Sequence, residues 1–217
     1  MTYIYDKVRL RFSIDEGSCR LAREGGFETA SFFVEGNLSP RIRRYTEENI
    51  AEVIAIGYKY DYFSRRLSLP LLTPRQKQLL CASLVSADLE EDKEYALKRL
   101  KGAECYSIDG VYNFRLGELR RRWEGVIDYI PRQFGESSLD DFVEFLVEEG
   151  EGTVYLKDGR LYDEGYRLLS RRLLLPEGDL ATEILLNGAS KVYCFGQVER
   201  KTKDFLRKYY RDNVFFC

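Results

Sequence analysis

The sequence predicts an α+β fold in which a central helical region is flanked by small mixed β elements. Three observations lead to this prediction. Apolar and polar residues alternate in segments near both ends, as in strands with one wet face. Apolar residues recur every three or four positions in the middle, as in helices. Asp158-Gly159 separates two strand-like runs, as in a two-residue hairpin turn. The C-terminal part should therefore contain a hairpin and a strand–helix–strand unit.

The N-terminal region is expected to form a small βαβ-like unit. Residues 7–13 alternate, with Val8, Leu10 and Phe12 on one face, which predicts a strand. Residues 18–24 are expected to form a short helix that stops at Gly25-Gly26, and residues 29–34 a second strand.

The central region carries several helix signals. Helix starts are expected at Thr46 followed by two glutamates, at the Thr73–Gln76 capping box with Pro74, and at Asp88 with Glu91. The clearest apolar stripe begins near Phe114, ends before Pro131 and contains Leu116, Leu119, Trp123, Val126, Ile127 and Ile130.

In the C-terminal region, segments with the apolar spacing of helices and segments with that of strands follow one another. Further helices are expected from Ser138-x-x-Asp141 to Gly150, from a cap at Asp179 to Asn187-Gly188, and over residues 198–210. Strands are expected in the hairpin over residues 153–160, as a buried strand over 191–195, and over 214–217. A strand, a helix and a strand in that order predict a parallel crossover.

We expect one domain over residues 1–217, with a soft boundary near residues 102–106. This boundary would separate an N-terminal α/β region with its helices, residues 1–104, from the motif helices and C-terminal α/β region, residues 105–217.

Composition excludes several classes of function. Histidine is absent, so a Ser-His-Asp or Cys-His pairing and an imidazole metal ligand are excluded. We lean against an enzyme, which would need carboxylates, lysine, tyrosine, cysteine or a cofactor, and we assign no catalytic, cofactor-binding or metal residue. The net charge is −2, from 34 Lys and Arg against 36 Asp and Glu, so we do not expect nucleic acid as a partner.

The cysteines indicate a reducing compartment. The five cysteines are widely spaced without C-x-x-C, which favours free, mostly buried thiols over a disulfide framework or a zinc site. No apolar signal segment follows Met1, and we find no uncharged stretch long enough to cross a bilayer, so a cytoplasmic location is expected.

Three constellations leave alternatives open. Asp140, Glu144 and Glu148 share a helix face, which would be solvated, paired with Arg120, Arg121 or Arg122, or able to hold a hard cation. Those three arginines and Arg115 form a basic cluster beside Trp123 that would contact phosphate or stack on bases. Alternatively, the four-residue spacing would pair Glu118 with Arg122 and Glu124 with Arg120. Gly196, between a strand and a helix, would be a simple turn or an anion site. The 16 Tyr and 13 Phe would line the rim of the core or a partner surface.

The segment from Tyr106 to Leu116 carries the pattern Ile-x-Gly-Φ-x-x-Phe-Arg-Leu, where Φ is apolar. Further along, Asp179-Leu-Ala-Thr-Glu-Ile-Leu-Leu leads into Lys191-Val-Tyr-Cys-Phe. With the order of elements between them, these motifs resemble the YtxC-like sporulation protein family of spore-forming Firmicutes, over about residues 45–217. The resemblance implies a cytoplasmic, sporulation-related setting without a defined activity. It singles out Gly110 as a turn, Phe114 and Leu116 as core anchors, and Arg115 as a paired or surface-recognition residue.

Three functions follow as hypotheses. The first is a non-enzymatic cytoplasmic protein that binds a protein partner, in a sporulation setting. The second is a small-ligand- or metal-binding protein or an enzyme, with Asp140, Glu144 and Arg115 as the first candidate residues. The third is a nucleic-acid binder that uses Arg120, Arg121 and Arg122.

Overall fold

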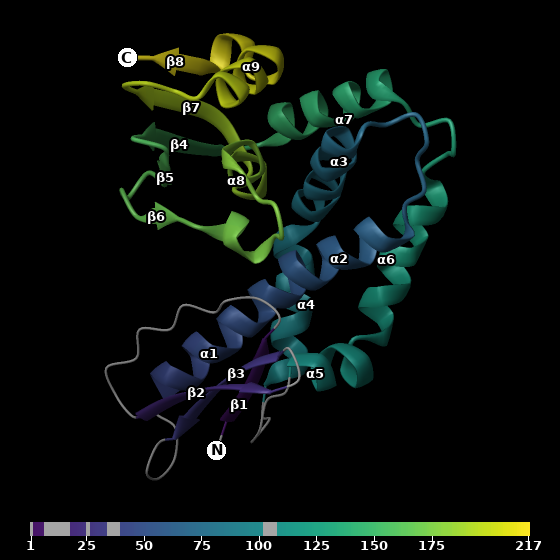
Figure 1. The fold of residues 1–217 in the computed structure, drawn as a ribbon, viewed down its shortest axis with the longest axis vertical. Coiled ribbons are helices and arrows are strands. Elements are labelled where there is room, and N and C mark those ends of the chain that lie inside the picture. The colour runs from purple at the N-terminus through teal and green to yellow at the C-terminus, as the bar shows by residue number, and fades with distance from the viewer. Residues whose placement is uncertain (1, 7–17, 25–26, 34–39, 102–107) are drawn as a thin grey trace. The chain divides into compact units, whose positions relative to one another are not determined.

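A computed structural model describes residues 2–6, 18–24, 27–33, 40–101 and 108–217 (Figure 1). The α+β class predicted from the sequence is confirmed. The chain forms two compact units, each assembled from separate stretches of sequence. Unit 1 contains residues 1–59 and 90–126, and unit 2 contains residues 60–89 and 127–217. The soft boundary expected near residues 102–106 lies outside the described residues.

Unit 1 contains an antiparallel sheet instead of the predicted βαβ-like unit. Its strands, in the order β1-β3-β2, are β1 Thr2–Asp6, β2 Ser18–Glu24 and β3 Phe27–Phe33. The prediction of a helix over residues 18–24 is wrong, because β2 pairs with β3 along its whole length. A helix of that length is only marginally stable alone, whereas an antiparallel neighbour supplies partners for the backbone. The strand expected near residues 29–34 is confirmed as β3, and residues 7–13 lie outside the described ones.

Helices make up most of the rest of unit 1. They are α1 Pro40–Glu52, the π-helical turn η1 Val53–Tyr58, α4 Leu89–Leu100, α5 Ile108–Arg115 and α6 Gly117–Tyr129. The first residue of α4 and residues 127–129 of α6 belong to unit 2. The prediction that Thr46 caps a helix is wrong, because α1 starts at Pro40 and Thr46 is buried inside it. Proline suits the start of a helix, where its missing N–H costs nothing.

The apolar stripe predicted after Phe114 lies mainly on α6 and begins just before that helix. Its first members, Leu116, Leu119 and Trp123, are almost completely buried. Leu116 lies between α5 and α6, so the stripe starts at a break in the helix that its spacing did not reveal.

Unit 2 contains the remaining helices. They are α2 Lys59–Arg66, whose first residue belongs to unit 1, α3 Pro74–Ala87, α7 Glu136–Glu149, α8 Leu180–Leu186, α9 Arg200–Tyr209 and the 3₁₀ turns η2 Arg171–Leu174 and η3 Arg211–Asn213. The capping box at Thr73 and the cap at Asp179 are confirmed, each with reciprocal side-chain bonds. Helix α7 begins at Glu136, before the predicted Ser138, and ends at Gly150 as expected. Within the described ranges, no helix is long and apolar enough to cross a membrane.

A five-stranded mixed sheet forms the other half of unit 2, in the order β6-β5-β4-β7-β8. The strands are β4 Gly152–Lys157, β5 Arg160–Tyr162, β6 Leu168–Leu169, β7 Ala189–Phe195 and β8 Val214–Phe216. The predicted hairpin is confirmed, because Lys157 pairs with Arg160 across Asp158 and Gly159, both at positive φ. The predicted strand–helix–strand unit is confirmed as β7, α9 and β8, whose strands are parallel.

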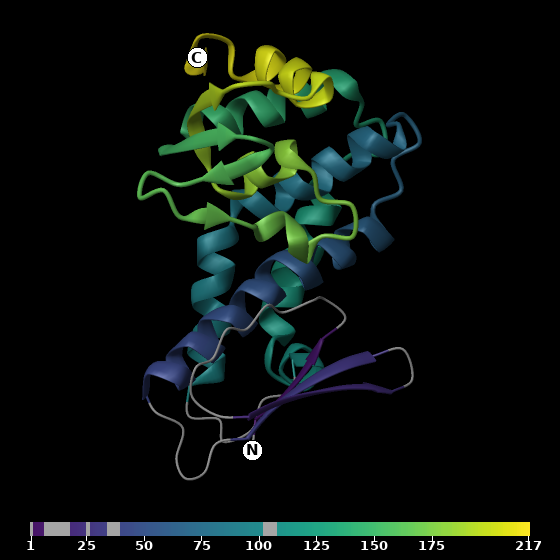
Figure 2. The same cartoon turned by 60° about the vertical axis from the view of Figure 1, so that its left-hand side comes forward.

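Helices cover one face of this sheet and leave the other open (Figures 1 and 2). Val154, Leu156, Val192 and Cys194 point to the covered face and are buried. Strand β7 was expected to be buried, but only one of its faces is, since Lys191 and Phe195 on the other side are exposed. Because successive side chains of a strand point to opposite faces, every second residue of β7 lies on the open face.

Candidate functional site

The residues singled out by the family resemblance lie at the junction of α5 and α6. Leu116 is completely buried, as expected of a core anchor. Phe114 is 88% exposed, so the expectation that it anchors the core is wrong. Gly110 lies inside α5 and is not a turn. Arg115 donates to the backbone oxygen of Arg99 at 3.2 Å, in agreement with a paired surface residue.

The three neighbouring arginines contact different groups. Arg121 pairs with Glu118, which the spacing had assigned to Arg122. Arg120 donates to the backbone oxygen of Asn113 at 2.9 Å, and Arg122 donates to Asp92 at 2.9 Å. Each guanidinium therefore has a different partner, which weakens the hypothesis of a shared phosphate site.

Asp92 is the centre of a buried polar cluster in unit 1. Its carboxylate is 2% exposed, forms an ion pair with Nζ of Lys59 at 2.7 Å, and accepts from Nε1 of Trp123 at 2.8 Å and from Arg122. The Lys59 side chain is completely buried. A buried lysine next to a π-helical turn resembles a reaction centre, but the carboxylate already compensates its charge. This cluster therefore joins Lys59, the residue that follows η1, to α4 and α6.

The predicted acidic stripe of α7 faces the end of α9 and the residue that follows it. Asp140 accepts from the Tyr209 hydroxyl at 2.6 Å and pairs with Lys208 at 2.7 Å, and Glu144 pairs with Arg211. Glu148 is exposed. Burial, and then the bond to Asp140, raise the pKa of Tyr209 well above its usual value. Asp140 and Glu144 thus form ion pairs within unit 2, and Glu148 remains the solvated member of the stripe.

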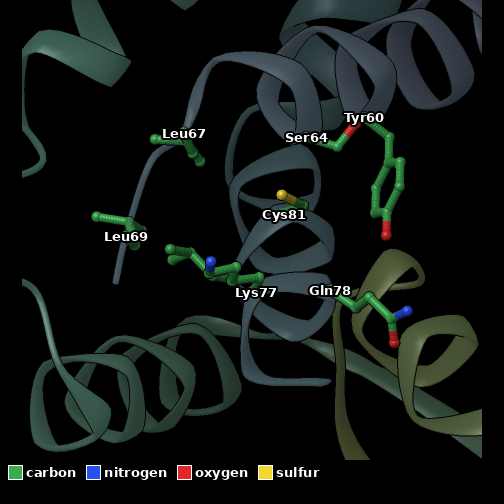
Figure 3. Close-up of a pocket in the computed structure, with 8 residues that line it drawn as sticks. Tyr60, Ser64, Leu67, Leu69, Lys77, Gln78 and Cys81 are labelled. Carbon is green, nitrogen blue, oxygen red and sulfur yellow. The ribbon is translucent and has the colours of Figure 1, made fainter. Parts of the chain in front are cut away.

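A small cavity lies between α2, α3 and the segment that joins them (Figure 3). Its volume is about 80 Å³, and its polar groups come from Tyr60, Ser64, Lys77, Gln78 and Cys81. Burial raises the pKa of Cys81 and of Tyr60 to about 12 each, so both groups are neutral at physiological pH. A neutral thiol in an apolar setting is a poor nucleophile, so this cavity is a weak candidate for a reaction site.

The described cysteines are free thiols. Cys81 and Cys194 are buried and Cys217 is exposed. Within the described ranges, no group of three or more Cys, Asp or Glu side chains is placed to hold a metal ion. Gly196 leads towards α9, but Glu199 puts a carboxylate at the start of that helix, where an anion would have to bind.

The open face of the five-stranded sheet carries a stack of aromatic side chains. Tyr155 lies opposite Tyr193 in the register of β4 and β7, and Tyr193 lies opposite Phe215 in β7 and β8. The ring centroids are 5.6 Å apart in the first pair and 4.7 Å in the second, with interplanar angles of 24° and 17°. Tyr166 stacks on the other side of Tyr155 at 5.3 Å. Four rings therefore form one continuous stack across the strands.

The loop between β5 and β6 presents Tyr166 to this stack. Tyr166 has a φ of 56° and is 74% exposed. Asp163 holds the loop, because its carboxylate accepts from the backbone N–H groups of Gly165 and Arg167, both at 2.9 Å, and from Arg167 Nε at 2.8 Å. These bonds, the N–H of Arg167 first among them, lower the pKa of Asp163. Left-handed backbone is costly for a residue with a side chain, and such strain is typical of functional positions.

Further apolar side chains extend the aromatic surface. Phe195 lies 6.4 Å from the ring of Tyr155 and is 39% exposed. Leu168, on β6, lies opposite Tyr162 of β5 and is 54% exposed. Phe215, at the end of the stack, is 40% exposed. Contiguous exposed apolar surface is rare on monomeric proteins and marks an interaction site, so this face is the best candidate site.

Sequence reasoning missed this surface, although one signal for it was present. Alternation in residues 153–157 and 191–195 puts an aromatic residue where a strand with a wet face would carry a polar one.

Comparisons with protein-family models, curated proteins and solved structures find no match to this chain. The assignment of the site therefore rests on the geometry of the sheet.

Proposed function

We propose that this chain is a non-enzymatic protein that binds a protein partner through the open face of its C-terminal sheet. The stack of Tyr166, Tyr155, Tyr193 and Phe215 carries the proposal. Tyrosine and phenylalanine are enriched at the centres of protein interfaces, because they bury a large area at a low cost in side-chain entropy. The resemblance to the YtxC-like family adds a cytoplasmic, sporulation-related setting to the proposal.

Site-specific photo-crosslinking in sporulating cells tests this proposal. A benzophenone amino acid replaces Leu168 on the open face or, as a control, Phe145 on α7, which have nearly the same exposure of 54% and 55%. We expect a discrete protein adduct from position 168 that is absent from position 145. Adducts of equal strength at both positions, or none at position 168, would contradict the proposal.

Pairwise binding of the purified proteins completes the test. The captured protein is mixed with the chain, and the dissociation constant is measured for the unchanged chain and for Phe215→Ser. Phe215 lies on the edge strand β8 and is 40% exposed, so its replacement should leave the fold intact. We expect the affinity to fall about tenfold or more, as for an aromatic residue inside an interface. An unchanged affinity would exclude the end of the stack from the interface.

A further inference from the structure

The charged residues within the strands of the open face all have the same sign. The strands of this sheet contain three charged residues, Lys157, Arg160 and Lys191. Each is exposed, and the strand register places each on the open face. Lys157 lies opposite Arg160 on β5 and opposite Phe195 on β7, and Lys191 lies opposite Thr153 on β4. None of the three forms an ion pair with another residue that the structure describes. Cations without partners beside an aromatic surface are available to a ligand.

These cations lie on both sides of the aromatic stack. Lys157 is level with Phe195 and Arg160, Tyr155 is level with Tyr193, and Lys191 is level with Thr153. Lys157 and Lys191 are therefore four strand positions apart, about 13 Å, with the stack midway between them. A complementary surface would carry two negative groups on either side of an apolar centre.

Acidic groups of the chain itself lie at the rim of this face. Glu164 accepts from the backbone N–H of Thr153 at 3.3 Å, and Asp163 pairs with Arg167. The same loop borders a shallow groove of about 360 Å³ that includes Thr153 and Leu169. Both rim carboxylates have partners within unit 2, so they leave Lys157, Arg160 and Lys191 to an external ligand.

The arrangement of the rings favours a protein over single-stranded nucleic acid. Bases bind to aromatic side chains by stacking on an uncovered ring face. Here Tyr155 lies between Tyr166 and Tyr193, and Tyr193 lies between Tyr155 and Phe215, with centroid distances of 4.7–5.6 Å. The inner rings cover each other's faces and present their edges outwards. Edges and hydroxyl groups suit contacts with apolar and polar side chains of a protein.

We infer that the partner presents an acidic segment in which two carboxylates flank an apolar side chain. The inference rests on the proposed function and specifies its partner. The apolar side chain packs on the edges of the Tyr155–Tyr193 stack, and the carboxylates contact Lys191 on one side and Lys157 with Arg160 on the other. In an extended segment, this spacing corresponds to acidic–x–apolar–x–acidic, because alternate side chains share a face and residues i and i+4 are about 13 Å apart.

A titration with labelled peptides tests the inference on the full chain. The probes are a fluorescein-labelled peptide with the core Glu-Thr-Leu-Thr-Glu, the same peptide with Lys in place of both Glu, and labelled oligodeoxythymidine. Anisotropy gives the affinities, and ¹⁵N NMR spectra give the location. We expect the acidic peptide to bind at least tenfold more tightly than the other two probes and to shift the amide signals of β4 and β7.

Charge variants provide the control. Combined Lys157→Glu, Arg160→Glu and Lys191→Glu should reduce the affinity for the acidic peptide at least tenfold, and raising the salt concentration should also weaken binding. Combined Lys157→Arg, Arg160→Lys and Lys191→Arg should preserve it. Circular dichroism checks that both variants fold, as expected for changes at exposed positions.

The outcomes separate this inference from the proposed function. Equal binding of the acidic and basic peptides, or no effect of charge reversal, would overturn the acidic partner. Tighter binding of oligodeoxythymidine would replace it with nucleic acid. If crosslinking at position 168 still captures a protein in either case, the proposed function stands and only the chemistry of the partner is wrong.

Discussion

At the scale of single residues, the most consequential side chains of unit 1 are buried and charged. Lys59 is completely buried and Asp92 nearly so, and their ion pair is completed by Trp123 and Arg122. Breaking a buried pair leaves an uncompensated charge, which costs far more than the pair itself contributes. The cluster therefore makes the fold of unit 1 sensitive to one carboxylate.

Replacing Asp92 with Ala should lower the free energy of unfolding by about 3–5 kcal/mol, because Lys59 loses its buried counterion and Trp123 loses its buried acceptor. Urea denaturation measures the change. Glu94→Ala on the same helix is the control and should have little effect, since Glu94 pairs with Lys98 in solvent. Combining Asp92→Leu with Lys59→Met should recover part of the loss. No recovery would show that the cost comes from packing and not from the charge of Lys59.

The thiols provide a second residue-scale prediction. Burial raises the pKa of Cys81 to about 12 and that of Cys194 to about 11. Because the thiolate is the reactive form, iodoacetamide at pH 8 should modify the exposed Cys217 at least about tenfold faster than either. Peptide mapping by mass spectrometry identifies the modified sites. Equal rates at all three cysteines in the folded chain would contradict the burial described for β7 and α3.

The same raised pKa values have a consequence for stability at high pH. A thiol whose pKa is higher in the folded state stabilises that state below its unfolded pKa, here 9.0. That contribution is lost as the pH rises from 9.0 to about 11 for Cys194. A Cys194→Val variant should show a smaller fall in stability over this range.

At the scale of elements, local signals predicted structure well where the backbone bonds are local. The capping boxes at Thr73 and Asp179 and the Asp158-Gly159 turn need only residues adjacent in sequence, and all three are confirmed. Residues 18–24 were misassigned because their bonding partners lie in another strand, and no local pattern reveals that pairing.

The candidate site was missed for a related reason. Alternation could show that Tyr155 and Tyr193 share the period of strands, but only the register of β4 against β7 places them opposite each other. The prediction for Phe114 was wrong in the opposite sense, because a residue expected in the core is exposed. Phe114 lies in α5, before the break that separates this helix from the apolar stripe on α6. Contacts between side chains that only non-local strand pairing brings together could not be predicted from the sequence.

The β5–β6 loop gives an element-scale prediction. Asp163→Ala should release the loop and separate Tyr166 from Tyr155, because three hydrogen bonds to the carboxylate are lost. Ring-current shifts of the tyrosine signals and faster amide exchange at Arg167 would report it. Asp163→Asn retains an acceptor and should give an intermediate effect. Unchanged tyrosine shifts in Asp163→Ala would show that the stack forms without the loop.

The pH dependence of this loop has a definite sign. The pKa of Asp163 is lowered in the folded state, so the stabilisation by its carboxylate is present above the usual pKa of 3.8. It is lost as the pH falls through the lowered folded value. The loop should therefore stay closed through neutral and mildly acidic pH, and the same tyrosine signals should change only in stronger acid.

At the scale of the whole molecule, the two units interleave along the chain. Unit 2 takes residues 60–89 from before the last part of unit 1 and joins them to residues 127–217. Helix α3 is bound to α8 within unit 2: the Ser86 hydroxyl donates to the backbone oxygen of Leu185 at 2.6 Å, and Arg75 pairs with Asp179. Cutting the chain once therefore cannot isolate unit 2. A fragment that starts after residue 89 lacks α3, and a fragment that contains both α3 and the sheet also contains residues 90–126 of unit 1.

The fragment Ile127–Cys217 should consequently lack fixed tertiary structure. Without α3, it loses the burial provided by Leu79, Leu80, Leu84 and Val85, each worth about 2 kcal/mol, against a typical domain stability of about 5–15 kcal/mol. Fusing residues 60–89 to Ile127 through a flexible Gly-Ser linker should restore the fold, because it returns α3 without unit 1. Dispersion of ¹⁵N NMR signals and cooperativity of urea unfolding distinguish the two fragments. If Ile127–Cys217 alone unfolds as cooperatively as the fusion, α3 is dispensable and the sheet with α7, α8 and α9 is a domain by itself.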